Sequence, residues 1–194
     1  MTRNTGSPRI TDHVIARHTR ARPAAPHTTA ELNTITTLLR GIGAHSISVG
    51  HGRERACIDA AQALAEAWED AGDPSPPSCV LGTVDWPATA ASWLRPARRL
   101  LAGCPDAWVI ADTPIGFAQL ARRLAEQPGW SPSRTFAFAN LADPDLIALA
   151  DPDLIALAGP DLAGLSGAIA NGDVWHLGRH TLVTDHLNST VLAL

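Results

Sequence analysis

Apolar residues recur along the chain with two alternating periods. From residue 31 onward, segments with apolar positions three and four residues apart alternate with short runs that are almost wholly apolar. The first period is typical of a helix with one buried face, and the second of a strand buried on both faces. The predicted helices cover 31–43, 53–71, 89–103 and 115–129, and the predicted strands cover 45–51, 78–86, 106–114 and 134–140.

This alternation predicts the fold class. Strands that alternate with helices of this length need right-handed crossovers and lie parallel in one sheet, with helices on both faces. We therefore predict an α/β fold, a three-layer sandwich with a mainly parallel sheet. Pro96 is expected to kink or split its helix. The segments 165–171 and 174–184 are predicted to be the last strands, with antiparallel pairing at the edge as an option.

The chain divides into two predicted regions. Residues 1–30 lack the alternating pattern and are expected to form a disordered tail, whereas 31–194 are expected to form a single α/β domain. Within that domain the phrase ADPDLIAL occurs at 142–149 and again at 150–157. A solenoid needs units of roughly 20 to 50 residues, so this is not a repeat architecture. We interpret the second copy as a duplication in a surface connection, restarted as a short helix by Asp151 and Pro152.

Composition narrows the function classes. The 194 residues carry a net charge of -4 with a pI near 6.0, which gives no electrostatic reason to expect nucleic acid or an acidic membrane as a partner. No secretory signal pattern and no apolar run of membrane-spanning length is present, so we expect no membrane insertion and a cytoplasmic location. The basic residues are all arginine, which excludes lysine chemistry and, with abundant Ala, Gly and Pro, indicates a GC-rich coding bias of the actinobacterial type.

Metal and nucleophile chemistry has no signature in the sequence. Cys57, Cys79 and Cys104 are odd in number and lack C-x-x-C spacing, so we expect free thiols, buried or half-buried. His176 and His180 would lie about 13 Å apart along one strand, too far to share a metal ion. No Gly-x-Ser-x-Gly turn is present. We therefore predict no catalytic residue, no metal and no cofactor.

The candidate ligand site lies at the strand ends. In parallel sheets, ligands bind beyond the carboxyl ends of the strands. The stretch VGHGRER at 49–55 places His51 between two glycines before a helix, where free N–H groups favour an anion; a tight turn with a packed histidine is the equally weighted alternative. The predicted ligand-binding residues are His51, Arg53, Trp86, Asp112, Thr113 and Asn140.

Three stretches carry a resemblance to a known family. The run from TTLLRGIGAHSISVGH through CVLGTVDWPATAASWLRPARRLLAGCPDAWVIADTPIGFAQLARRL to RTFAFANLADPDLIAL resembles the second lobe of type I periplasmic solute-binding proteins, the leucine/isoleucine/valine-binding kind found with ABC transporters. The likeness covers about 34–165 and rests on the order and spacing of elements. It implies a Rossmann-like α/β lobe whose amino-acid site would draw on His51, Arg53, Asp112, Thr113 and Asn140.

The sequence departs from that family in two respects. His51 replaces the aromatic residue often found after the first strand, and the whole first lobe and the secretion signal are missing. The leading hypothesis is a non-catalytic domain that binds a small polar, amino-acid-like molecule, with a homodimer as one way to complete the cleft.

Two alternatives stay open. VGHGRERA is also similar to the GHGSR turn of class II chelatases, in which His51 would bind the metal inserted into sirohydrochlorin; ADTPIGFAQL, however, offers no second histidine. The third hypothesis is a purely interacting domain that uses its N-terminal Arg/His tail.

Overall fold

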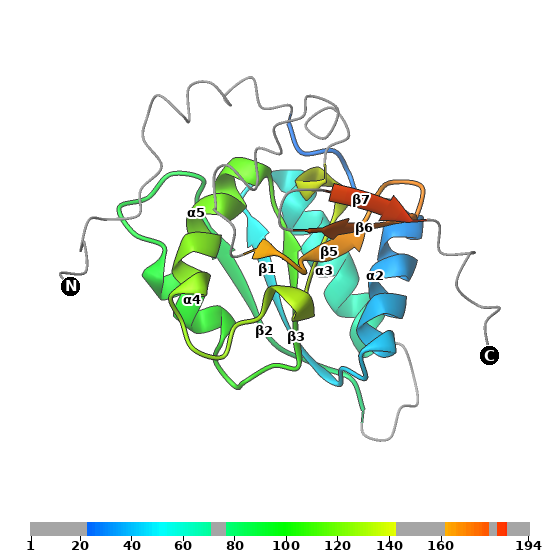
Figure 1. The fold of residues 1–194 in the computed structure, drawn as a ribbon, viewed down its shortest axis with the longest axis horizontal. Coiled ribbons are helices and arrows are strands. Elements are labelled where there is room, and N and C mark those ends of the chain that lie inside the picture. The colour runs from blue at the N-terminus through cyan, green and yellow to red at the C-terminus, as the bar shows by residue number, and fades with distance from the viewer. Residues whose placement is uncertain (1–22, 71–76, 143–161, 179–181, 186–194) are drawn as a thin grey trace.

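A computed structural model describes residues 23–70, 77–142, 162–178 and 182–185 (Figure 1). The helices of these ranges are α2 (Thr29–Gly41), α3 (Arg55–Glu69), α4 (Leu94–Leu100) and α5 (Pro114–Ala125), with 3-10 turns η1 (Pro132–Arg134) and η2 (Ala139–Leu141). The strands are β1 (Ser46–Gly52), β2 (Cys79–Trp86), β3 (Ala107–Ala111), β4 (Thr135–Ala137), β5 (Ser166–Ala168), β6 (Val174–Leu177) and β7 (Leu182–Asp185). No helix of the described ranges is long and apolar enough to cross a membrane.

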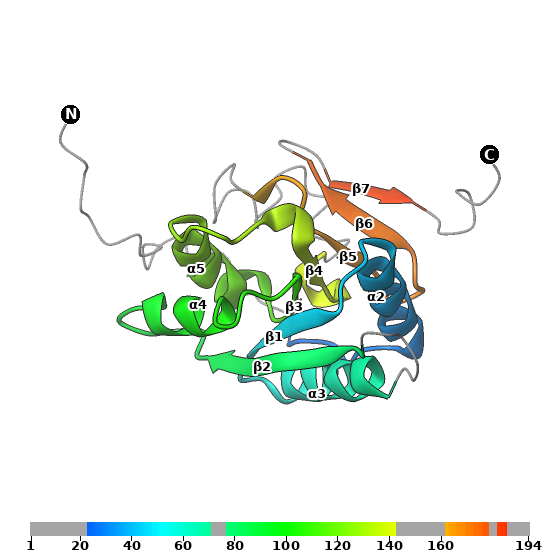
Figure 2. The same cartoon turned by 90° about the horizontal axis from the view of Figure 1, so that it is seen from below.

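The described strands form one sheet in the order β2-β1-β3-β4-β5-β6-β7. The pairs from β2 to β5 are parallel, and β6 and β7 add to the β5 edge in antiparallel fashion. Helices α2 and α3 cover one face of the sheet, and α4 and α5 cover the other (Figure 2). The predicted three-layer α/β sandwich with a mainly parallel sheet is therefore confirmed.

Strand β3 shows how the sequence divides the core into two halves. Its five residues are all buried, because it lies between β1 and β4 with helices on both sides. Ala107, Val109 and Ala111 belong to the cluster under α2 and α3, whereas Trp108 and Ile110 belong to the cluster under α4 and α5. Alternate side chains of a strand point to opposite faces, so one continuous apolar run serves both halves.

Hydrogen bonds at the N-terminal cap of helix α2 hold this helix at the carboxyl edge of the sheet. The Thr28 hydroxyl accepts from the Glu31 N–H at 3.1 Å, and the Glu31 carboxylate accepts from the Thr28 N–H at 2.7 Å, which is a reciprocal capping box. The other oxygen of Glu31 accepts from the Ala139 N–H at 2.9 Å. One buried carboxylate therefore ties the start of α2 to the loop that follows β4.

Two predicted elements differ from the observed ones. The helix predicted at 89–103 begins only at Leu94, so Pro96 lies in its first turn, where a missing N–H removes no helical hydrogen bond and no kink is needed. The strand predicted at 174–184 is instead two strands, β6 and β7, paired antiparallel. The repeat at 142–157, including Asp151 and Pro152, lies outside the described residues apart from Ala142.

Candidate functional site

The register of the parallel strands brings the predicted strand-end residues to one edge of the sheet. His51 is aligned with Asp85 of β2 on one side and with Ala111 of β3 on the other. Gly52 is aligned with Trp86, and Asp112 follows β3 directly. Because adjacent parallel strands end together, three chain segments that are distant in sequence, the ends of β1, β2 and β3, meet at this carboxyl edge.

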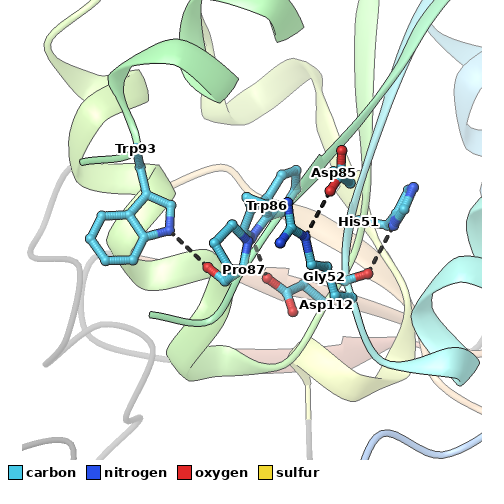
Figure 3. A network of polar contacts seen from close by, with 8 residues as sticks. His51, Gly52, Asp85, Trp86, Pro87, Trp93 and Asp112 are labelled. Carbon is cyan, nitrogen blue, oxygen red and sulfur yellow. Dashed lines mark hydrogen bonds and ion pairs between the residues drawn. The ribbon is translucent and has the colours of Figure 1, made fainter. Parts of the chain in front are cut away.

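The centre of this edge is a buried carboxyl group, that of Asp112, which is only 4% exposed. Its Oδ2 accepts a hydrogen bond from the indole Nε1 of Trp86 at 2.6 Å (Figure 3). Its Oδ1 accepts a hydrogen bond from the Thr113 N–H at 2.7 Å. Trp86 has no exposed surface. Both were predicted to contact a ligand, and in this structure both lie beneath the surface as a support for the residues above them.

Two glycines enclose Asp112. A Cβ atom on Gly52 or on Gly116 would overlap the carboxyl oxygens of Asp112. Gly52 ends β1, and Gly116 lies in the first turn of α5. The absence of side chains at these two positions is what allows β1 and α5 to approach the carboxyl group closely enough to exclude water.

Burial decides the charge state of this carboxyl group. The two N–H donors favour the ionised form, but desolvation dominates and raises the pKa of Asp112 to about 7, with a smaller rise from the nearby charge of Glu54. The same surroundings raise the pKa of the buried Cys57 thiol to about 12, by desolvation first and by repulsion from Asp112 and Glu54 second. Cys57 is therefore an unreactive thiol.

The three cysteines differ in exposure. Cys57 is buried, as predicted, but Cys79 and Cys104 are exposed. Both exposed residues lie at the opposite, amino-terminal edge of the sheet, since Cys79 begins β2 and Cys104 precedes β3. All three are free thiols.

Above the buried carboxyl group lies an accessible ion pair. The Arg53 guanidinium donates to Asp85 at 2.8 Å, with side-chain exposures of 61% and 43% (Figure 3). The hydrogen bond from Arg53 holds the pKa of Asp85 below its usual value. An exposed pair of this kind adds little stability, because water screens it. Arg53 can therefore turn toward an incoming anion at small energetic cost.

His51 is half-buried with its ring fixed by a backbone contact. Its Nδ1 lies 2.8 Å from the Gly52 carbonyl oxygen (Figure 3). A carbonyl can only accept, so Nδ1 carries the proton and Nε2 is left as the acceptor of the neutral ring. His51 thus presents one ring nitrogen with a defined role beside Arg53.

Thr113 and Asn140 occupy the β3 and β4 side of the edge. Thr113 is half-buried and immediately precedes α5, whose first helical residue is Pro114. The side-chain amide of Asn140 accepts from the Ala25 N–H at 2.8 Å and donates to the Ala25 carbonyl at 2.9 Å. Asn140 is therefore already paired with the chain's own backbone.

The segment before α2 is the part of this edge that sequence reasoning missed. Besides the Asn140 contacts, the Ala24 N–H donates to Glu54 at 2.9 Å, and the Thr28 hydroxyl donates to the Ala170 carbonyl at 2.7 Å. Residues 23–28 were assigned to the N-terminal tail, and they lie across the carboxyl edge. No local sequence signal marks the contacts of Ala24 and Ala25, because these two residues contribute only backbone atoms.

A metal centre is not assembled among the described residues. No group of three or more His, Cys, Asp or Glu side chains within them could hold a metal ion. The chelatase hypothesis for His51 therefore gains no support from its surroundings. His180 and His186 lie outside the described residues, and His176 is exposed on β6.

Several solved structures of α/β proteins resemble the fold of this chain. A substrate-binding periplasmic protein from Ralstonia solanacearum has a TM-score of 0.58 and 19% identity, with 75% of this chain and 37% of that chain covered. A candidate branched-chain amino acid ABC transporter from Rhodospirillum rubrum has a TM-score of 0.55 and 19% identity, with coverages of 72% and 36%. An extracellular ligand-binding receptor from Verminephrobacter eiseniae has a TM-score of 0.54 and 14% identity, with 79% of this chain and 41% of that chain covered.

These neighbours are type I periplasmic binding proteins, so the resemblance stated from the sequence is confirmed for the fold. The matched part of the chain covers 36%, 37% and 41% of the lengths of the Rhodospirillum, Ralstonia and Verminephrobacter proteins. No protein-family model matches the sequence, and the search of curated proteins finds no significant match.

Proposed function

We propose that the carboxyl edge of the sheet binds a small polar molecule with a carboxylate, of the amino-acid type, without chemical conversion. The observation that carries this proposal is the group of accessible polar side chains, His51, Arg53 and Thr113, held above a closed interior. Arg53 offers a planar pair of donors that matches a carboxylate, and His51 offers a ring nitrogen at a fixed position. The structural neighbours named as substrate-binding proteins support a binding role of this kind.

Trp86 and Asp112 act indirectly in this proposal. Their mutual hydrogen bond fixes the end of β2 against the end of β3, and with it the positions of Asp85 and Thr113. Asn140 contributes to ligand binding only if the Ala25 backbone gives up its two hydrogen bonds. The ligand contacts of these three residues stay predictions.

The test is isothermal titration calorimetry of the purified chain against the protein amino acids and related small acids. We expect at least one binder, weakened about tenfold or more by His51→Ala, since a lost hydrogen bond to a charged group is worth roughly 1.5–3 kcal/mol. The matched control is His45→Ala, which removes an exposed histidine just before β1, at the opposite edge of the sheet. The proposal is contradicted if no compound of the panel binds, or if both variants lose the same amount of affinity.

A second copy of the chain would complete the cleft. The solved neighbours are about twice as long as this chain, so we infer that it corresponds to one lobe and supplies one wall of a two-lobed site. We propose that a homodimer supplies the opposite wall. Sedimentation velocity with and without the ligand found by calorimetry tests this, because a dimer that closes on the ligand becomes more populated when it is bound. A monomer in both conditions contradicts the dimer and leaves the edge site standing.

A cytoplasmic location also stays a proposal. Two exposed free thiols, Cys79 and Cys104, fit a reducing compartment, where such groups persist without forming disulfides. Fractionation of the source cells with an antibody against the chain tests it, and recovery outside the cytoplasm contradicts it.

A further inference from the structure

A hollow of about 410 Å³ lies along the outer side of α4. Helix α4 lies at the margin of the molecule beside α5 (Figure 2). Its inner side is buried through Ala97 and Leu100, so the hollow belongs to the opposite, exposed side. The residues that line it are Ser92, Leu94, Arg95, Arg98, Arg99 and Ala102.

Three arginines of one helix face line this hollow, together with Leu94 and Ala102. Arg95, Arg98 and Arg99 are spaced i, i+3 and i+4, which places their side chains next to one another. From Arg95 to Arg99 the helix advances about 6 Å. Like charges at this spacing repel and destabilise a helix, so the cluster calls for a compensating negative charge.

The chain itself does not supply that charge within the described residues. Three other surface arginines there have carboxylate partners, in the pairs Arg53–Asp85, Arg55–Asp59 and Arg123–Glu126. No described carboxylate forms an ion pair with any of the three arginines of the hollow.

Helix electrostatics explains only part of the cluster. Arg98 and Arg99 lie in the last turn of α4, where a cation interacts favourably with the helix dipole. Arg95 is the second residue of the helix, where a cation is unfavourable, and no acidic residue accompanies it in that turn. Helix electrostatics therefore does not account for Arg95.

We propose that this hollow binds an anion of the oligophosphate class. Guanidinium groups bind phosphate oxygens through paired N–H donors, and three neighbouring ones match a ligand with several charged phosphoryl groups. The Ser92 hydroxyl accepts from the Leu94 N–H at 3.2 Å and can donate its own hydrogen to a ligand oxygen. This site is independent of the one proposed at the carboxyl edge.

Calorimetric titration of the full chain with inorganic triphosphate tests the site. We expect one saturable site, weakened about tenfold or more in the triple variant Arg95→Gln, Arg98→Gln, Arg99→Gln, because each guanidinium contributes charge-assisted hydrogen bonds. The charge-matched control is Arg40→Gln, Arg55→Gln, Arg123→Gln, which removes three arginines elsewhere on the surface. Equal affinities in the wild type and the first variant, or equal losses in the two variants, overturn the proposal, provided circular dichroism shows both variants folded.

A second measurement, with lipid vesicles, distinguishes a free oligophosphate from a lipid headgroup as the ligand. Phosphatidylcholine vesicles with and without a phosphatidylinositol phosphate are sedimented with the wild type and the triple variant. Binding to triphosphate alone supports a free anion as the ligand. Binding to both, lost together in the triple variant, supports the site with a lipid headgroup as its source. Binding to neither overturns the proposal.

Discussion

Two aspartates lie at the two ends of strand β3, and the pKa values of their carboxyl groups are shifted in opposite directions from the usual value. Asp106 precedes the strand at the amino edge, and its Oδ2 accepts hydrogen bonds from the His45 N–H, the Ser46 N–H and the Ser46 hydroxyl at 3.1, 2.8 and 2.8 Å. These bonds hold the pKa of Asp106 below its usual value. Asp112 follows the strand at the carboxyl edge, and burial raises its pKa to about 7.

The difference shows which physical effect decides at each end of the sheet. Both groups accept hydrogen bonds from N–H donors, so donors alone do not separate them. Asp106 is half-exposed and keeps its hydration in part, whereas Asp112 is enclosed by Gly52 and Gly116. Water therefore stabilises one charge and is excluded from the other. At the amino edge, Asp106 connects the start of β3 to the start of β1. At the carboxyl edge, the enclosed carboxyl group of Asp112 lies beneath accessible polar side chains.

The largest expected effect is the pH dependence that Asp112 imposes on stability. Between pH 3.8, its unfolded pKa, and about 7, the folded chain holds a proton that the unfolded chain has released. Stability from this group is therefore fully present below pH 4 and is lost as the pH rises through 7. A shift of this size corresponds to about 4 kcal/mol.

Urea unfolding of the wild type and of Asp112→Asn from pH 4 to pH 8 measures this effect, because the variant cannot titrate at this position. The advantage of the wild type over the variant should shrink as the pH rises. An advantage that grows with pH would show that the Trp86 and Thr113 donors outweigh burial, and would make the two aspartates alike.

Gly52→Ala should have the next largest effect. The new Cβ would overlap Asp112, a short buried side chain with two hydrogen bonds and no room to move, so we expect a loss of about 2–3 kcal/mol in urea unfolding. Gly82→Ala is the control, since a Cβ there meets nothing within 4 Å. The loss should be much smaller in an Asp112→Ala background. Equal losses in both backgrounds would show that Asp112 does not set the packing of this edge.

Sequence patterns predicted the fold and the edge because both depend on local periodicity. The alternation of helices and strands was enough to place His51, Arg53 and Asp112 at one edge, since parallel strands end together. The patterns could not show that Gly52 and Gly116 close around Asp112, because that contact depends on how β1 and α5 approach each other. For the same reason Trp86 was expected in a cleft and lies in the core.

Backbone contacts between distant segments were equally invisible. The pairing of Ala25 with Asn140 uses only the main chain on one side, and main-chain groups are the same in every sequence. The break between β6 and β7 was also missed, although Gly178, a residue type that is depleted in strands, interrupts the run from 174 to 184 directly after β6. What the sequence encodes locally could be predicted, and what depends on long-range packing could not.

Asp106→Asn should have the smallest effect, and it tests the other half of the comparison. The lowered pKa means that the contribution of Asp106 is present above pH 3.8 and is lost as the pH falls through its folded pKa. At pH 7 the variant should lose about 1 kcal/mol or less, because the amide oxygen can still accept the same hydrogen bonds and water screens this half-exposed group. Asp59→Asn, which removes an exposed partner of Arg55, is the control and should change stability less. A variant more stable than the wild type at pH 7 would show that Asp106, like Asp112, is a charge that the fold tolerates rather than uses.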